Sequence, residues 1–129
     1  MKMKTLVLVA LSVAAVTATQ AKADPTVGSV KEIELQGVTA GKNVLLHINS
    51  CDITQIDPPT LKCLMKSGHR EYAVFKTSKE VAKTLTDGGS ANRRRIPCTY
   101  ESAAKVGRQT VIQCSNTVTE YSKESYFKD

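Results

Sequence analysis

Two histidines and two cysteines form the most suggestive cluster in the sequence: His47 and Cys51 precede a proline-containing loop, and Cys63 and His69 follow it. Imidazole and thiolate are typical zinc ligands. However, His47 and Cys51 lie four residues apart on a predicted strand, which separates them by about 13 Å at about 3.3 Å per residue. One ion binds both only if the strand breaks. We therefore predict no metal site and no cofactor.

The four cysteines are better explained as disulfides, because an even number of cysteines in an exported chain is typical of a disulfide framework. Cys98 and Cys114 flank two extended arms that fold about Val106, which would bring the two cysteines opposite each other. The sequence therefore predicts a Cys98–Cys114 disulfide and, by elimination, a Cys51–Cys63 disulfide.

Catalytic motifs are weak in this chain. Ser102-Ala103-Ala104-Lys105 matches the Ser-x-x-Lys spacing of penicillin-recognising enzymes, but its companion motifs are missing and it lies in a predicted hairpin turn. Glu32 and Glu34 would share one face of a strand with no evident cleft between them. We expect no enzymatic activity, and a small hydrolase that uses His47 or His69 stays open as an alternative.

The run Arg93, Arg94 and Arg95 is the one unusual concentration of charge. It lies in a predicted polar loop just before Pro97 and Cys98, which would hold one end of the loop. Guanidinium groups match the geometry of carboxylates and phosphates. We predict these three arginines as binding residues for an acidic protein, an envelope lipid phosphate or an acidic glycan. A solvated loop is the alternative interpretation.

The first 23 residues have the features of a secretory signal peptide. Lys2 and Lys4 are followed by the uncharged stretch Leu6–Val16, and small residues flank Lys22 just before Asp24. The apolar stretch is shorter than the roughly 20 residues needed to span a bilayer. We predict cleavage before Asp24, no membrane-spanning segment, and a location in the periplasm or outside the cell.

The charge of the mature chain is modest. Removing Lys2, Lys4 and Lys22 leaves 15 of the 18 basic side chains against 12 acidic ones, so the net charge falls from +6 to +3. A balance this small does not indicate a nucleic-acid partner. The remaining 106 residues suit one small domain, 24–129.

Most of the mature chain has strand-like patterns. In the segment from Asn43 to Ser50, the residues Val44, Leu46 and Ile48 alternate with more polar ones, which predicts a strand with one buried face. The other extended segments are predicted at Val30–Leu35, Leu61–Met65, Arg70–Lys76, Ile96–Ser102 and Arg108–Cys114.

One short helix interrupts the strands. Thr77 is the predicted cap and Glu80 its capping-box partner, Val81 and Leu85 form an apolar pair, and glycines end the helix. The predicted fold is therefore α+β and mainly β: a small antiparallel sheet of about five strands with one short helix and two disulfides.

The expected function follows from the weakness of the catalytic signals. We interpret the chain as a small exported binding or inhibitor-type protein without enzymatic activity. The alternatives are the hydrolase named above and a structural subunit of an envelope assembly, for which an unpaired strand edge would be a sign.

Overall fold

A computed structural model describes residues 24–67, 69–87 and 93–123. The predicted signal peptide, residues 1–23, lies outside the described residues. Within the described ranges the chain forms seven strands and two helices. In chain order they are β2 (Thr26–Val27), α1 (Val30–Leu35), β3 (Asn43–Gln55), β4 (Thr60–Met65), β5 (Glu71–Thr77), α2 (Lys79–Thr86), β6 (Arg94–Val106), β7 (Gln109–Val118) and β8 (Ser122–Lys123).

Five of the strands close into a small barrel. The sheet order is β2-β3-β4-β5-β7-β6-β8, and a further pairing between β3 and β6 completes the ring. The strands β2 and β8 extend the ring at β3 and β6. A closed five-stranded barrel in which a long connection carries the chain from the third strand to the fourth has the architecture of the OB-fold.

The predicted mainly β fold with two disulfides is confirmed. The sheet is mixed instead of wholly antiparallel, because β5 pairs with β7 in parallel, as β2 does with β3. Parallel pairing requires a long crossover, and α2 with β6 supplies it between β5 and β7.

The barrel interior is aliphatic, as the sequence pattern of β3 predicted. Val44, Leu46 and Ile48 are fully buried, and Phe75 is the only aromatic residue among the buried core residues that the structure describes. No helix in the described part of the chain is long and apolar enough to cross a membrane.

Both predicted disulfides are present. Cys51 and Cys63 are directly opposite each other in the β3–β4 pair. In the β6–β7 pair it is Tyr100 that faces Cys114, so Cys98 reaches Cys114 from two residues away, next to a bulge in β6. The hairpin turns at Gly107, whose φ of +64° suits the first central position of a two-residue turn.

The segment Val30–Leu35 is a helix, so the predicted strand there is wrong. Ser29 caps the helix and accepts a hydrogen bond from the Glu32 amide at 3.1 Å, and only Ile33 is buried. The Ser-x-x-Glu spacing of a capping box was the sequence signal for this helix, and it outweighs the weak alternation of six residues.

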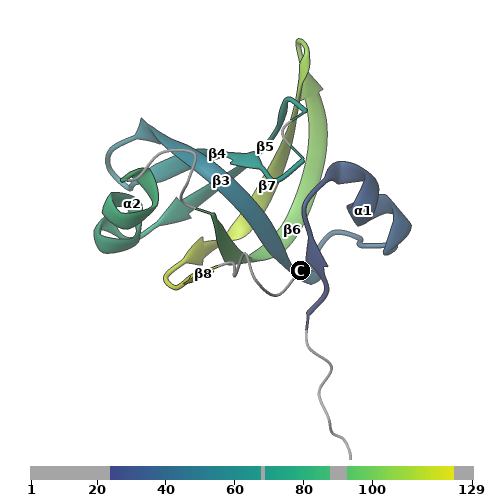
Figure 1. Cartoon of the computed structure of the whole chain (residues 1–129), viewed down its shortest axis with the longest axis horizontal. Coiled ribbons are helices and arrows are strands. Elements are labelled where there is room, and N and C mark those ends of the chain that lie inside the picture. Colours follow the sequence, from purple (N-terminus) through teal and green to yellow (C-terminus); the bar gives the residue numbers. More distant parts are fainter. Residues whose placement is uncertain (1–23, 68, 88–92, 124–129) are drawn as a thin grey trace, which may run out of the picture.

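The second helix is close to its prediction. Its cap is Ser78 instead of Thr77, and Val81, Ala82 and Leu85 are buried against the barrel. Thr77 instead ends β5, where its buried hydroxyl donates to the carbonyl oxygen of Val118 at 2.6 Å. Figure 1 shows α1 and α2 on opposite sides of the barrel, so they leave the outer surfaces of the strands between them accessible.

Candidate ligand-binding cleft

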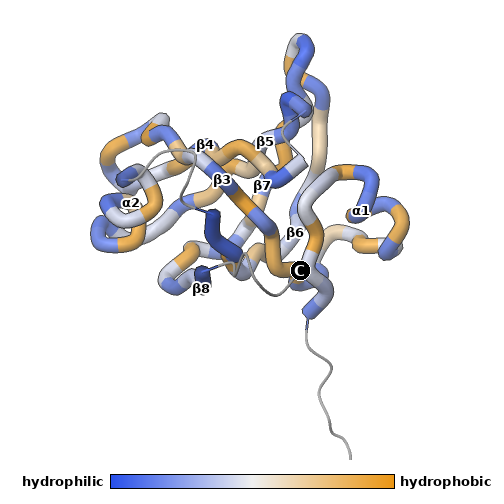
Figure 2. Tube along the Cα trace, in the orientation of Figure 1, coloured by the Kyte–Doolittle hydropathy of each residue, from blue (hydrophilic) through white to orange (hydrophobic). Residues whose placement is uncertain are grey.

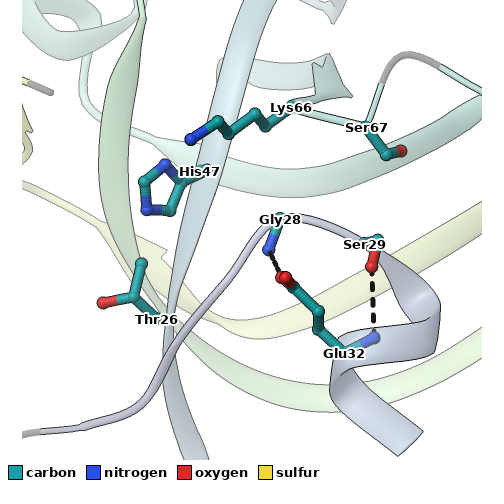
Figure 3. Close-up of a pocket in the computed structure, with 7 residues that line it drawn as sticks. All are labelled: Thr26, Gly28, Ser29, Glu32, His47, Lys66 and Ser67. Atoms are coloured by element: carbon teal, nitrogen blue, oxygen red, sulfur yellow. Dashed lines mark hydrogen bonds between the residues drawn. The ribbon is translucent and has the colours of Figure 1, made fainter. Parts of the chain in front are cut away.

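A cleft of about 400 Å³ lies where the start of α1 approaches the outer face of β3 and the end of β4. Figure 3 shows its polar wall, to which His47 and Lys66 contribute from the sheet side. The full lining comprises Thr26, Gly28, Ser29, Glu32, His47, Lys66 and Ser67. This volume falls within the size range of small-molecule sites.

The carboxylate and hydroxyl groups at the α1 side hold the helix in place. The Glu32 carboxylate accepts a hydrogen bond from the Gly28 amide at 2.5 Å, and the Ser29 hydroxyl caps the helix (Figure 3). Glu71 accepts from the Val30 amide at 2.9 Å and from the Ser67 hydroxyl at 3.1 Å. These groups position the cleft wall, since they bind backbone amides and one another.

Basic side chains lie in one row at the sheet side of the cleft, on β6, on β3 and directly after β4. His47 faces outward from β3 between buried Leu46 and Ile48. Arg95 of β6 is its direct cross-strand partner, so the two side chains leave the same face of the sheet. On the other side, the Lys66 amide donates to the His47 carbonyl oxygen at 3.1 Å, and Lys66 lines the same cleft. We call Arg95, His47 and Lys66 the basic row.

Gly28 allows the chain to pass close to this row. The residue is buried, and its carbonyl oxygen accepts a hydrogen bond from the Ser67 amide at 3.0 Å. A Cβ atom at position 28 would lie 3.2 Å from the Lys66 Cβ and 3.6 Å from the His47 Cβ. The floor of the cleft is therefore packed against the basic row.

The three predicted arginines do not form one loop. Arg94 and Arg95 belong to β6, which corrects the predicted polar loop at these positions. Successive side chains of a strand leave opposite faces. Arg95 therefore joins the basic row, whereas the guanidinium of Arg94 lies over the Tyr121 ring at 5.6 Å from its centroid. The start of β6 is strongly hydrophilic in Figure 2.

Two polar atoms near the basic row are buried without a described hydrogen-bond partner. One is the Nε of Arg95, although its Nη2 donates to the Lys123 carbonyl oxygen at 3.4 Å. The other is the Oδ1 of Asn49, two residues beyond His47 on β3. Leaving such a group unsatisfied costs about 1–3 kcal/mol.

The remaining predicted chemistry is separated in space. His69 is exposed between β4 and β5 and does not line the cleft. Cys51 and Cys63 are joined to each other, so neither supplies a thiolate to a metal. The described residues contain no group of three or more His, Cys, Asp or Glu placed to hold a metal ion.

Sequence reasoning found His47 and Arg95 but missed their neighbours Lys66, Gly28 and Asn49. These residues converge through the register of β3 with β4 and β6, and that register is set by pairings between distant segments. The exposed ends of strands carry no local signal for such a convergence.

No protein-family model, curated protein or solved structure matches this chain. The barrel architecture by itself does not assign a function, because the same architecture carries many activities. The function is therefore argued from the cleft.

Proposed function

We propose that this protein is an exported binding protein that holds an acidic saccharide in the cleft beside α1. The observation that supports the proposal is the basic row, in which Arg95 of β6, His47 of β3 and Lys66, which directly follows β4, lie side by side. His47 and Lys66 line the polar cleft, and Arg95 is the cross-strand neighbour of His47. The positive charges of Lys66 and Arg95 beside a concave surface favour an anionic ligand.

The local carboxylates only partly offset this charge. Glu32 lies in the cleft but accepts a hydrogen bond from the Gly28 amide, and Glu71 accepts from Val30 and Ser67. A carboxylate, sulfate or phosphate on the ligand would bind at Lys66 in the lining and extend past His47 toward Arg95, because charge-assisted hydrogen bonds are the strongest available.

The hydroxyl-rich chemistry of the cleft favours a saccharide over other anions. Thr26, Ser29 and Ser67 supply hydroxyl groups, and Glu32 and His47 add further polar atoms to the same lining. Single-stranded nucleic acid is usually bound on stacking platforms, and the described lining includes no Phe, Tyr or Trp.

Binding is favoured over hydrolysis by the partners that two of the cleft hydroxyls have. Ser29 caps α1, and the Ser67 hydroxyl donates to Glu71, which is not part of the cleft lining. A nucleophile requires a hydrogen-bonded base that is itself held in orientation. Ser67 has such a partner in Glu71, which the Val30 amide holds, but Glu71 lies outside the cleft lining, so this carboxylate does not face a ligand in the cleft.

The two disulfides are compatible with export to an oxidising compartment. All four cysteines are paired, and disulfides persist in the periplasm and outside the cell. Acidic polysaccharides are abundant surface polymers in such places, which makes them a natural ligand class for the cleft.

The test is a titration of the mature chain, residues 24–129, with a heparin hexasaccharide and a hyaluronan hexasaccharide as acidic probes. Neutral maltohexaose and an oligothymidylate serve as comparisons. We expect binding to an acidic hexasaccharide that weakens with salt, because exposed charges are screened within about 10 Å at about 0.1 M salt. Lys66→Ala and Arg95→Ala should each weaken it about tenfold, the loss expected for one charge-assisted contact.

Two variants control for charge alone. Lys83 is an exposed lysine on α2, and Arg94 lies against Tyr121, so Lys83→Ala and Arg94→Ala should leave binding unchanged. Equal affinity for oligothymidylate would refute the saccharide assignment, and no affinity for any acidic probe would refute the anion site. Cleavage of a bound hexasaccharide would favour the hydrolase.

A further inference from the structure

The last part of β6 is a sheet edge beside which the structure describes no strand. On one side β6 pairs with β7 from Tyr100 to Val106. On the other side its pairing with β3 covers only Arg94 to Thr99, and backbone bonds to Gly41 and Lys42 end that contact at Tyr100. Among the described residues, no strand pairs with this side of residues 101–106, which we call the β6 edge.

Most residues of the β6 edge are exposed as well as unpaired, and α1 lines a pocket beside Ala103, Ala104 and Lys105. The β6–β7 hairpin projects beyond the rest of the molecule in Figure 1. Within the edge only Ala103 is partly buried, and Val106 is 60% exposed. Exposed edges of this length usually attract another strand unless they are blocked.

The hairpin turn determines which backbone groups the edge presents. Val106 and Gln109 flank a two-residue turn, and the pair next to such a turn is hydrogen-bonded. The next pair, Lys105 and Thr110, is therefore non-hydrogen-bonded, and the Thr110 amide indeed donates away from β6, to the Arg70 carbonyl oxygen at 2.9 Å. Lys105 and Ala103 consequently direct their N–H and C=O groups to the open side.

Charge selects one register for antiparallel pairing of this edge with a second copy of itself. A two-fold axis at Ala103 brings Glu101, which lies at the β6 bulge between Tyr100 and Ser102, beside Lys105 of the second copy, and the reverse pair forms by symmetry. Opposite charges across a strand pair are favourable. An axis at Glu101 or at Lys105 would instead place that residue opposite its own copy, which is repulsive. The small side chains of Ala103 and Ala104 leave room at the centre.

We propose that the β6 edge joins two copies of this chain into a symmetric dimer through antiparallel pairing centred on Ala103. The pairing continues the sheet of one barrel into the sheet of the other. It uses no residue of the basic row, so each copy keeps its own cleft.

Sedimentation analysis of the mature chain over a range of micromolar concentrations tests the dimer. We expect reversible dimers whose dissociation constant rises about tenfold in Glu101→Lys and in Lys105→Glu, because each variant places like charges opposite each other. An equimolar mixture of these two variants should restore dimers, since the charges of the two chains then match. Arg108→Glu, an equal change of charge in the turn, is the control and should dimerise normally.

Ala103→Pro provides a second test that does not depend on charge. Proline removes the N–H that faces the open side but no bond to β7, so the variant should fold, as shown by an unchanged urea-unfolding midpoint, and remain monomeric. A chain that is monomeric at every concentration would overturn the proposal. Dimers that survive Ala103→Pro, or a variant mixture that stays monomeric, would also overturn it.

Discussion

At the scale of single residues, the cleft depends on the absence of a side chain at position 28. Gly28 is buried under the basic row, with Lys66 and His47 as its nearest neighbours. Its carbonyl oxygen is bonded to the Ser67 amide and its own amide to Glu32. Position 28 therefore links the start of α1 to the end of β4.

We expect Gly28→Ala to reduce both stability and ligand binding. The new methyl group would lie 3.2 Å from the Lys66 Cβ, so Lys66 must shift. Overpacking typically costs about 1–3 kcal/mol. Alanine also has less conformational freedom than glycine in the unfolded chain, which recovers about 0.4–1 kcal/mol of stability. The net loss of stability should therefore be about 1 kcal/mol. Urea unfolding measures the stability, and titration with the heparin hexasaccharide measures the cleft.

Gly107→Ala separates the loss of stability from the loss of binding. Gly107 has a φ of +64° with nothing within 4 Å of a Cβ, so alanine there is strained but displaces nothing. It should lower stability by about 1 kcal/mol without changing affinity. If Gly28→Ala bound as well as the parent chain, the close packing of the cleft floor would be refuted.

The residue types in the site were predictable, but their grouping was not. The sequence predicts one charged loop at Arg93, Arg94 and Arg95. In the structure, alternation along β6 places Arg94 against Tyr121 and Arg95 beside His47. Strand β6 begins inside the arginine run, at Arg94. Its pairing with β3 and β8 determines this start, although the polar composition of the run favours a loop.

At the scale of elements, a side chain connects β6 and β7 where their backbones separate. Beyond the Tyr100–Cys114 pair, Asn116 accepts from the Thr99 amide at 2.8 Å and donates to the Pro97 carbonyl oxygen at 3.0 Å. Along β6, the backbone pairs with β7 from Tyr100 onward and with β8 at Arg94 and Arg95. The Asn116 side chain supplies the hydrogen bonds to the segment of β6 between these two pairings.

Asn116→Ala should destabilise the fold by about 1–3 kcal/mol, because it leaves the Thr99 amide and the Pro97 carbonyl oxygen without their partner. The urea-unfolding midpoint measures the loss. The neighbouring Thr117 is exposed, and Thr117→Ala should change stability by less than about 0.5 kcal/mol. Equal stability of the two variants would show that the bridge contributes nothing.

Local sequence patterns predicted the element type well where one face of the strand or helix is buried and the other is exposed. The alternation of β3 and the apolar face of α2 gave the correct element types. The segment Val30–Leu35 failed because a single buried residue, Ile33, leaves almost no periodicity, and capping by Ser29 determines the helix. The length of β3, which runs on to Gln55, depends on pairing with β4 instead of its own pattern.

At the scale of the whole molecule, the barrel already engages the chain at Pro25, one residue after the predicted mature start at Asp24. The Leu45 amide donates to the Pro25 carbonyl oxygen at 2.8 Å, and β2 follows immediately. A cut before Asp24 therefore keeps every described element.

Intact-mass analysis of the exported protein should give the mass of residues 24–129 with both disulfides formed. Small residues at Ala21 and Ala23 set this position. A mass that includes the first 23 residues would refute cleavage, and a mass lacking Pro25 would place the cut inside the fold.

The two disulfides were predictable because each joins neighbouring segments, 12 and 16 residues apart. The closure of the barrel was not, since it pairs Asn43 with Thr99 through side-chain packing distributed over the whole core. No short window of sequence contains that information.

The same closure fixes an order of assembly. The β3–β4 hairpin is complete once residue 65 is present, but the seam between β3 and β6 requires residues 94–99. A chain that emerges from its amino end therefore holds an open β3 edge until β6 arrives. Contacts between distant residues form slowly, so closing this seam, and not forming the first hairpin, limits how quickly the barrel matures.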